Sequence, residues 1–173
     1  NIPGVLFSTG NLFDSHEALE MERVVLAVYD PKNERHITAA LATDMMGLKG
    51  EALADRVKDE TGWEEWIAKF RGYHDLWNER GFIRMFRYLL TQENVMPRLM
   101  SLKDGERRNT NLLHLAEVLQ QTSIERKLGM SESLKWLTGQ RDEGSPRLDE
   151  HQLRLESDEN AVKIVTVHKS KGL

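Results

Sequence analysis

The feature of this sequence that most constrains its fold is where two kinds of hydrophobic pattern occur. Strand-like runs occur only near the ends, in residues 5–7 and 153–167. Between them, apolar residues recur at spacings of three and four, the pattern of amphipathic helices. A helical insertion into a sheet domain would produce this order, because both flanks then belong to one domain and the middle to another. We therefore predict a mainly α fold with a few strands at the two ends only.

About seven helices are expected between the strand-like ends. Two capping-box patterns and one asparagine cap mark helix starts: Asp14 with Glu17, Thr61 with Glu64, and Asn33. The first helix should end at about Tyr29, and Gly81 should close a helix rich in aromatic residues. After a loop around residues 139–150, Leu153 and Leu155 alternate with charged neighbours. Residues 162–167 then form the strongest predicted strand.

The composition limits the possible chemistry. A length of 173 residues corresponds to one domain, or one domain and the margin of another. The absence of cysteine excludes disulfides and thiolate metal sites, and it fits a cytoplasmic protein. No apolar run approaches the roughly 20 residues of a membrane helix, so no membrane contact is expected. With a net charge of -4, any contact with DNA must come from a local basic patch.

The segment from Ile164 to Leu173 carries the strongest functional signal. A predicted strand leads directly into a loop with a hydroxyl, an imidazole, two ammonium groups and a glycine. Loops at the carboxyl ends of strands are common ligand sites in α/β sheets. Thr166 and Lys169 suit phosphate oxygens, His168 suits a base, and Gly172 permits close backbone approach. An ordinary solvated turn is the alternative interpretation.

This segment resembles motif V of superfamily-one DNA helicases of the UvrD and RecB kind, in its RecB-like version. Residues 13–18 lie where that family has motif IV, and residues 105–117 resemble the helix just upstream of motif V. Residues 153–158 also match the RecB-type approach to the motif. The resemblance therefore extends over essentially the whole chain.

The resemblance implies a position within a larger motor. In this family, ATP binds between two RecA-like domains, and a helical accessory subdomain is inserted between motifs IV and V of the second domain. By this resemblance, residues 1–30 are the edge of the second motor domain, residues 31–150 are the accessory subdomain, and residues 151–173 return to the motor.

The resemblance also implies roles and partners. Thr166, His168 and Lys169 would contact DNA, and Gly172 would lie near the nucleotide. The parent would be an ATP-dependent helicase and exonuclease that acts in double-strand break repair and recombination, with ATP and Mg²⁺ as cofactors. Its partners would be DNA, the motor domains of the same chain, and gamma- and alpha-type subunits of a heterotrimer.

One position departs from the family. Many relatives carry an arginine in motif IV that reaches the nucleotide phosphates, whereas this chain has Ser15 and His16 there and no arginine. We therefore assign no phosphate-sensing role to this stretch.

We expect the segment itself to be non-catalytic and without a cofactor of its own. It contains no G-x-x-x-x-G-K-[ST] loop, which phosphoryl transfer by this type of motor requires. Its six histidines show no metal-ligand spacing, so no metal site is predicted. We interpret both ends of the sequence, Asn1 and Leu173, as cuts in a longer chain.

Several alternatives stay open. The chain could be a free-standing helical interaction domain, or the accessory subdomain of a UvrD- or AddA-type motor. An aromatic stripe is interpreted as core rather than as a base-stacking surface: Trp63, Trp66, Tyr73 and Trp77. A set of arginines is interpreted as a solvated face with ion pairs rather than as a duplex-binding patch: Arg80, Arg84, Arg87, Arg107 and Arg108.

Overall fold

The computed structural model of the chain describes residues 4–6, 11–141 and 162–164, with side chains in residues 11–141. This part is mainly helical, which confirms the predicted class. Its elements are β1 (Gly4–Leu6), a short 3-10 helix η1 (Leu12–Asp14), α1 (His16–Tyr29), α2 (Glu34–Leu41), α3 (Gly50–Lys58), α4 (Glu60–Arg80), α5 (Phe82–Gln92), α6 (Val95–Met100), α7 (Gly105–Glu125), α8 (Met130–Gln140) and β2 (Val162–Ile164).

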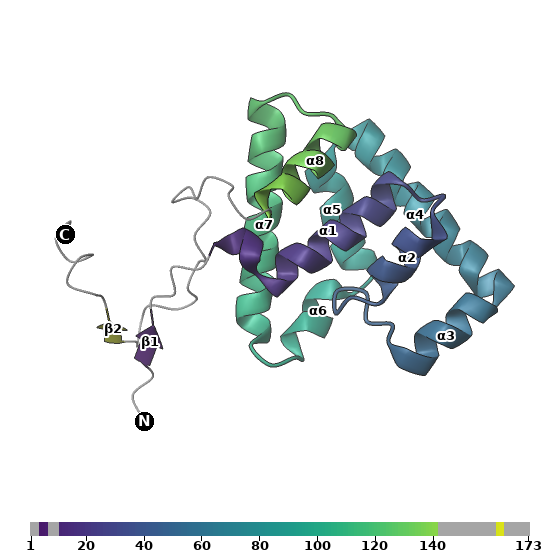
Figure 1. The fold of residues 1–173 in the computed structure, drawn as a ribbon, viewed down its shortest axis with the longest axis horizontal. Helices are drawn as coiled ribbons and strands as arrows, with labels where there is room; N and C mark the ends of the chain where they lie inside the picture. The colour runs from purple at the N-terminus through teal and green to yellow at the C-terminus, as the bar shows by residue number, and fades with distance from the viewer. Residues whose placement is uncertain (1–3, 7–10, 142–161, 165–173) are drawn as a thin grey trace.

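Helix α1 lies at the centre of the helical body. It contacts α2, α4, α7 and α8, and Figure 1 shows these helices around it. One side of α1 is fully buried, including Met21, Val24 and Val28. Residues 16–29 therefore share one core with the residues assigned above to the accessory subdomain. The division of the chain into domains itself stays a prediction.

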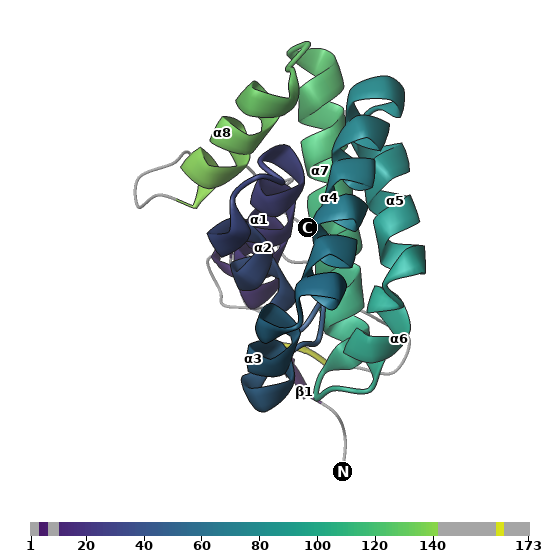
Figure 2. The ribbon, with the colours of Figure 1, turned by 90° about the vertical axis from the view of Figure 1, so that its right-hand side faces the viewer.

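Helices α4, α5 and α7 form the other wall of the body, in which α5 contacts both α4 and α7. Figure 2 shows α4 and α5 side by side. In α4 the buried aromatic residues follow the helical period and face this core: Trp63, Phe70, Tyr73 and Trp77. Trp66 is only half-buried, and its ring lies 6.4 Å from that of Phe70. The interpretation of the aromatic stripe as core is therefore confirmed.

The turn from α4 to α5 depends on a single glycine. Gly81 has φ +84° and ψ 165°, a conformation that is essentially restricted to glycine. It ends α4 and reverses the chain at once. Trp77 at the end of α4 thereby packs edge-on against Phe82, which stacks on Phe86 at 5.3 Å. The predicted helix end at Gly81 is confirmed.

The two short strands pair with each other. β1 and β2 are parallel, with Gly4 opposite Val162 and Leu6 opposite Ile164. Figure 1 shows the pair to one side of the helical body. β1 begins one residue before the predicted run at residues 5–7, and β2 covers the first half of the predicted strand at residues 162–167. Leu153 and Leu155 lie outside the described residues.

Two predicted helix starts are wrong. Ser15, not Asp14, caps α1, because its hydroxyl accepts a hydrogen bond from the backbone N–H of Ala18. Thr61 is no cap either, since α4 begins at Glu60 and Thr61 lies in its first turn. The third predicted cap is confirmed: the side chain of Asn33 accepts from the N–H of Arg35 at the start of α2.

Helix α3 was not predicted. It has only nine residues and none of them is fully buried, although Leu53 packs partly buried against the core. Among the described residues, no helix is both long and apolar enough to span a membrane.

Candidate functional site

The residues predicted to contact DNA and nucleotide lie outside the described residues. Thr166, His168, Lys169 and Gly172 all follow β2, which ends at Ile164. Their predicted roles stay predictions. The functional candidates within the described part of the chain are a charge cluster at the start of α1 and a groove between α4 and α5.

Ser15 has a local structural role. Its hydroxyl donates to the carbonyl of Leu12 at 2.6 Å and accepts from the N–H of Ala18 at 3.2 Å. It thus joins η1 to the first turn of α1. Ser15 therefore serves as the helix cap of α1.

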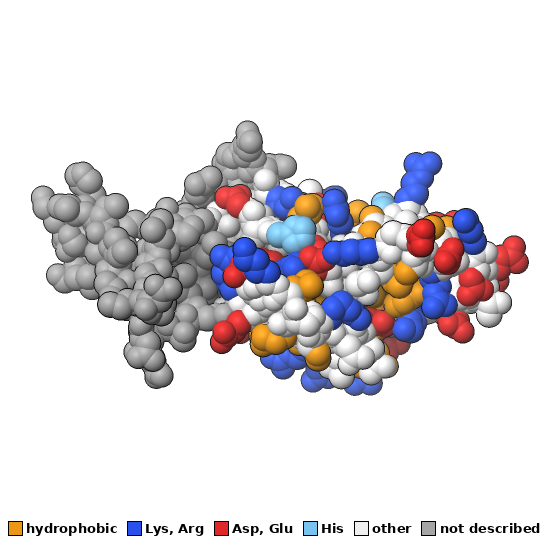
Figure 3. All heavy atoms as spheres, turned by 90° about the horizontal axis from the view of Figure 1, so that it is seen from below, with side chains coloured by type: hydrophobic (Ala, Val, Ile, Leu, Met, Phe, Trp, Pro, Cys, Tyr) orange, Lys and Arg blue, Asp and Glu red, His pale blue; other side chains and the backbone are white. Residues whose placement is uncertain are grey.

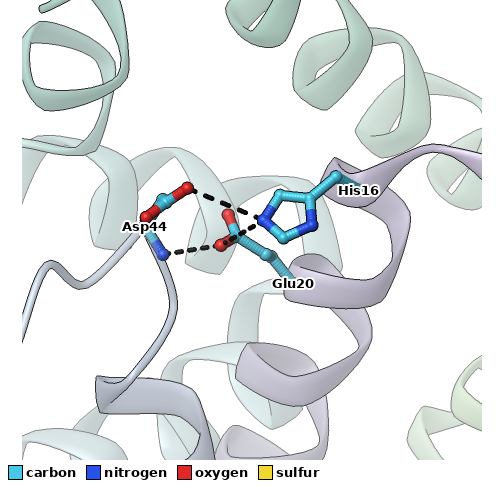
Figure 4. A group of neighbouring side chains, drawn as sticks. All are labelled: His16, Glu20 and Asp44. Carbon is cyan, nitrogen blue, oxygen red and sulfur yellow. Dashed lines mark hydrogen bonds and ion pairs between the residues drawn. The ribbon is translucent and has the colours of Figure 1, made fainter. Parts of the chain in front are cut away.

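His16 belongs to a cluster that sequence reasoning missed. Its Nε2 atom lies 3.1 Å from Glu20 Oε1, one turn along α1, and 3.6 Å from Asp44 Oδ2, in the connection after α2 (Figure 4). The backbone N–H of Asp44 also donates to Glu20 Oε1 at 2.6 Å. One ligand-type atom from each of the three side chains lies within 4.8 Å of the others, which is close enough to surround a metal ion. The i, i+4 pair was visible in the sequence, but the approach of Asp44 was not.

The carboxylates of this cluster are already paired with cations of the chain. Arg108 on α7 lies 2.8 Å from Asp44 Oδ2, 2.9 Å from Glu17 Oε1 and 3.4 Å from Glu20 Oε2. Lys49 forms a further close ion pair with Asp44. A metal ion at this position would have to displace the guanidinium from these carboxylates. The arrangement therefore fits an ion-pair network that links α1, α7 and the connection after α2 better than it fits a metal centre.

The ionisation of the cluster follows from these contacts. Burial opposes the charge on Asp44, but hydrogen bonds and attraction from Lys49 and Arg108 outweigh it and hold the pKa of Asp44 below its usual 3.8. Burial likewise opposes the charge on Arg108, and the bonds to Asp44 and Glu17 outweigh it and raise the pKa of the guanidinium. The ion pair between Asp44 and Arg108 therefore stays charged at neutral pH.

The predicted solvated basic face is wrong for Arg108, whose side chain is only 12% exposed. Its burial arises because α7 packs on α1, which brings residues 91 positions apart in sequence into contact. Arg107, in contrast, is 59% exposed and pairs with Asp104 at 3.3 Å. Arg80, Arg84 and Arg87 are also exposed. Figure 3 shows basic and acidic side chains intermixed on one face of the body.

The second candidate is a groove between α4 and α5 with a volume of about 500 Å³. At one side the hydroxyl of Tyr73 donates to Glu93, and Lys69 lies 3.1 Å from the same carboxylate. Burial, and then the hydrogen bond to Glu93, raises the pKa of Tyr73 well above its usual value. This tyrosine therefore stays protonated under ordinary conditions, and the groove fits binding better than acid–base chemistry.

Comparison with known proteins gives one consistent match. No protein-family model matches the chain. The chain is 38% identical over 175 residues to "RecBCD enzyme subunit RecB" of Escherichia coli, which covers 99% of this chain and 15% of that protein. It is 38% identical over 170 residues to the protein of the same name in Haemophilus influenzae. This match covers 97% of the chain and 14% of that protein. The protein of the same name in Mycolicibacterium smegmatis is 32% identical over 179 residues. This match covers 99% of the chain and 16% of that protein. The chain thus spans about one seventh of the length of these curated relatives.

Proposed function

The chain carries a RecB-type sequence from end to end, and on that premise we propose that it is the helical accessory segment of a RecB-type subunit. The observation that carries this proposal is the similarity over nearly all of the chain to one region of much longer RecB subunits. Relatives from several bacterial genera are each matched over a similar share of their length. The proposal therefore does not depend on motif V alone.

The topology of the chain supports an inserted subdomain. An insertion must begin and end at neighbouring points of its host domain. β1 and β2 pair in parallel although the whole helical body lies between them in sequence. Because α1 shares the core of that body, we place the start of the proposed subdomain near Asn11 rather than at residue 31. The strands would then be the adjoining edge of a RecA-like motor domain.

The activity proposed for the whole protein is that of an ATP-dependent DNA helicase and exonuclease, the beta subunit of an exodeoxyribonuclease V. It would unwind and degrade DNA from broken ends in double-strand break repair and recombination. ATP and Mg²⁺ would bind to the motor outside this segment, since the segment has no phosphate-binding loop. Gamma- and alpha-type subunits would complete a cytoplasmic heterotrimer.

Within that machine, the segment would have two roles. The helical body would be a non-catalytic support that holds other domains or partners in place. The stretch after β2 would couple DNA to the motor, with Thr166, His168 and Lys169 at the DNA and Gly172 near the nucleotide. Phosphate contacts by hydroxyl and ammonium groups position a strand, and an imidazole can stack on its bases.

The first experiment tests the role of the segment. The purified 173-residue chain should show no ATP hydrolysis above a buffer control, with or without single-stranded DNA. Turnover that rises with DNA would contradict the proposal. The second experiment tests the coupling role in the longer protein assembled with its partner subunits.

In that assembly, His168→Ala should reduce DNA-stimulated ATP hydrolysis and unwinding. His151→Ala is the matched control, because it removes an imidazole outside the motif V segment, just after the predicted loop at residues 139–150, and should leave both rates unchanged. Unaltered unwinding in the His168 variant would remove this residue from the proposed site.

A further inference from the structure

The groove between α4 and α5 has an apolar wall that is open to solvent. Tyr88 on α5 is 50% exposed, and its ring lies edge-on to the buried ring of Tyr73 at 6.1 Å. Leu76 on α4, which is partly buried, lines the same space. Figure 2 shows the two helices side by side on the face turned to the viewer. A single exposed aromatic residue is ordinary on a protein surface, but this one borders a hollow of about 500 Å³.

A glycine keeps the hollow open. Gly72 lies in the interior of α4 and lines the groove. A Cβ atom added there would meet nothing within 4 Å, so no close contact of the fold requires glycine at this position. Glycine inside a helix costs about 0.5–1 kcal/mol relative to alanine. The missing side chain instead leaves the backbone of α4 accessible to an approaching chain.

The rim of the groove is acidic. Of its four charged side chains, Lys69 and Glu93 neutralise each other at 3.1 Å. Asp75 and Glu79 are exposed, and neither forms an ion pair with any residue in the described part of the chain. They lie four residues apart on α4, where like charges repel. One positive and three negative groups leave the groove with a net charge of -2, which would repel DNA phosphates and attract a cationic partner.

We propose that this groove docks a segment of a partner protein that presents an apolar anchor flanked by arginine or lysine. The apolar side chain would pack on Leu76 and Tyr88 over the bare backbone at Gly72. A guanidinium beside it would meet the carboxylates of Asp75 and Glu79 and the face of the Tyr88 ring, which are the preferred partners of arginine. This docking surface is separate from DNA and ATP, and it deepens the support role proposed above by naming the chemistry of the partner.

The test uses two short fluorescent peptides and the 173-residue chain. Both peptides carry leucines at helical spacing; one carries arginines at the remaining positions and the other carries glutamates. In fluorescence anisotropy, the arginine peptide should bind at least about tenfold more tightly than the glutamate peptide. Equal affinities, or no measurable binding of the arginine peptide, would overturn the proposal. Binding of a single-stranded oligonucleotide in competition with the peptide would also overturn it.

Two substitutions locate the binding. Gly72→Gln fills the groove and should weaken binding of the arginine peptide at least about tenfold, while circular dichroism shows an intact helix because glutamine favours helices more than glycine does. Gly139→Gln in α8 is the matched control, since a Cβ there also meets nothing within 4 Å. It should leave the affinity unchanged. An affinity that survives Gly72→Gln, or falls equally in both variants, would refute docking in this groove.

A third variant tests the charge. Asp75→Asn combined with Glu79→Gln should weaken binding of the arginine peptide and flatten its dependence on salt, because both carboxylates contribute attraction. Unchanged affinity and salt dependence would refute the role of the acidic rim. None of these measurements involves unwinding or ATP hydrolysis. A negative result here would therefore leave the proposed helicase function standing, and failure of that function would leave this docking surface standing.

Discussion

Replacement of Arg108 by methionine should destabilise the helical body strongly. The Arg108 side chain is 12% exposed, and the carboxylates of Glu17 and Glu20 are 7% and 3% exposed. Removal of one partner from a buried ion pair costs about 3–5 kcal/mol, because the other charge stays buried without compensation. Asp44 keeps its ion pair with Lys49, which reduces the loss of stability. We therefore expect the lower end of the range, about 3 kcal/mol.

This loss can be measured by urea unfolding of the 173-residue chain, followed by circular dichroism at neutral pH. A loss of about 3 kcal/mol corresponds to a fall in Tm of roughly 6–12 °C for a protein of this size. Arg107→Met is the matched control, because Arg107 is the neighbouring residue but is 59% exposed. Its exposed ion pair with Asp104 should contribute no more than about 1 kcal/mol.

The dependence on pH separates the ion-pair explanation from simple loss of packing. The folded pKa of Asp44 lies below its usual 3.8, so its contribution to stability is present above pH 3.8 and is lost as the pH falls through the lowered value. Without Arg108, the pKa of Asp44 is lowered less. The difference between wild type and variant should therefore be largest at neutral pH and shrink in acid. A loss below about 1 kcal/mol, or a difference that is constant with pH, would refute the reasoning.

Three further substitutions test local features of the fold. Ser15→Ala should reduce the free energy of unfolding by about 0.5–2 kcal/mol through loss of the helix cap. Asp14→Ala should reduce it less. If urea unfolding showed a larger loss for Asp14→Ala than for Ser15→Ala, the observed cap would be contradicted. Gly81→Ala should cost about 1–3 kcal/mol in the same assay, because alanine cannot adopt the observed backbone conformation without strain; an unchanged midpoint would argue against this turn. Phe70→Ala should cost about 3–5 kcal/mol by leaving a cavity between α4 and its neighbours, and a smaller loss than that of Ser15→Ala would show that α4 does not form core.

The helices that the sequence predicted are those that bury a regular apolar stripe. In α4 the stripe includes Phe70 and Trp77, and in α5 it includes Phe86 and Leu89. Such spacing is encoded locally, because each helix turn repeats the same requirement for burial. Helix α3 is short and has no fully buried residue, and the sequence did not predict it. The cap of α1 was placed one residue early, because aspartate and serine are both good capping residues and only the backbone decides which one caps.

The two candidate sites depend on contacts that the sequence did not predict. The charge cluster needs Asp44 from a connection and Arg108 from α7, and no sequence pattern joins these residues to α1. Arg108 was interpreted as part of a solvated face, because a charged residue on a helix is usually exposed. The groove depends on which faces of α4 and α5 meet, and this is set by packing rather than by either helix alone.

The sequence by itself therefore determined the helical class, the ends of α1 and α4 and the resemblance to RecB-type helicases, because helix period, glycine positions and short motifs are local properties of the chain. Only the tertiary structure decided which charges are buried together and which groove stays open. Contacts such as that between Glu17 and Arg108 join residues 91 positions apart, and their energy depends on a burial that arises only when the helices pack.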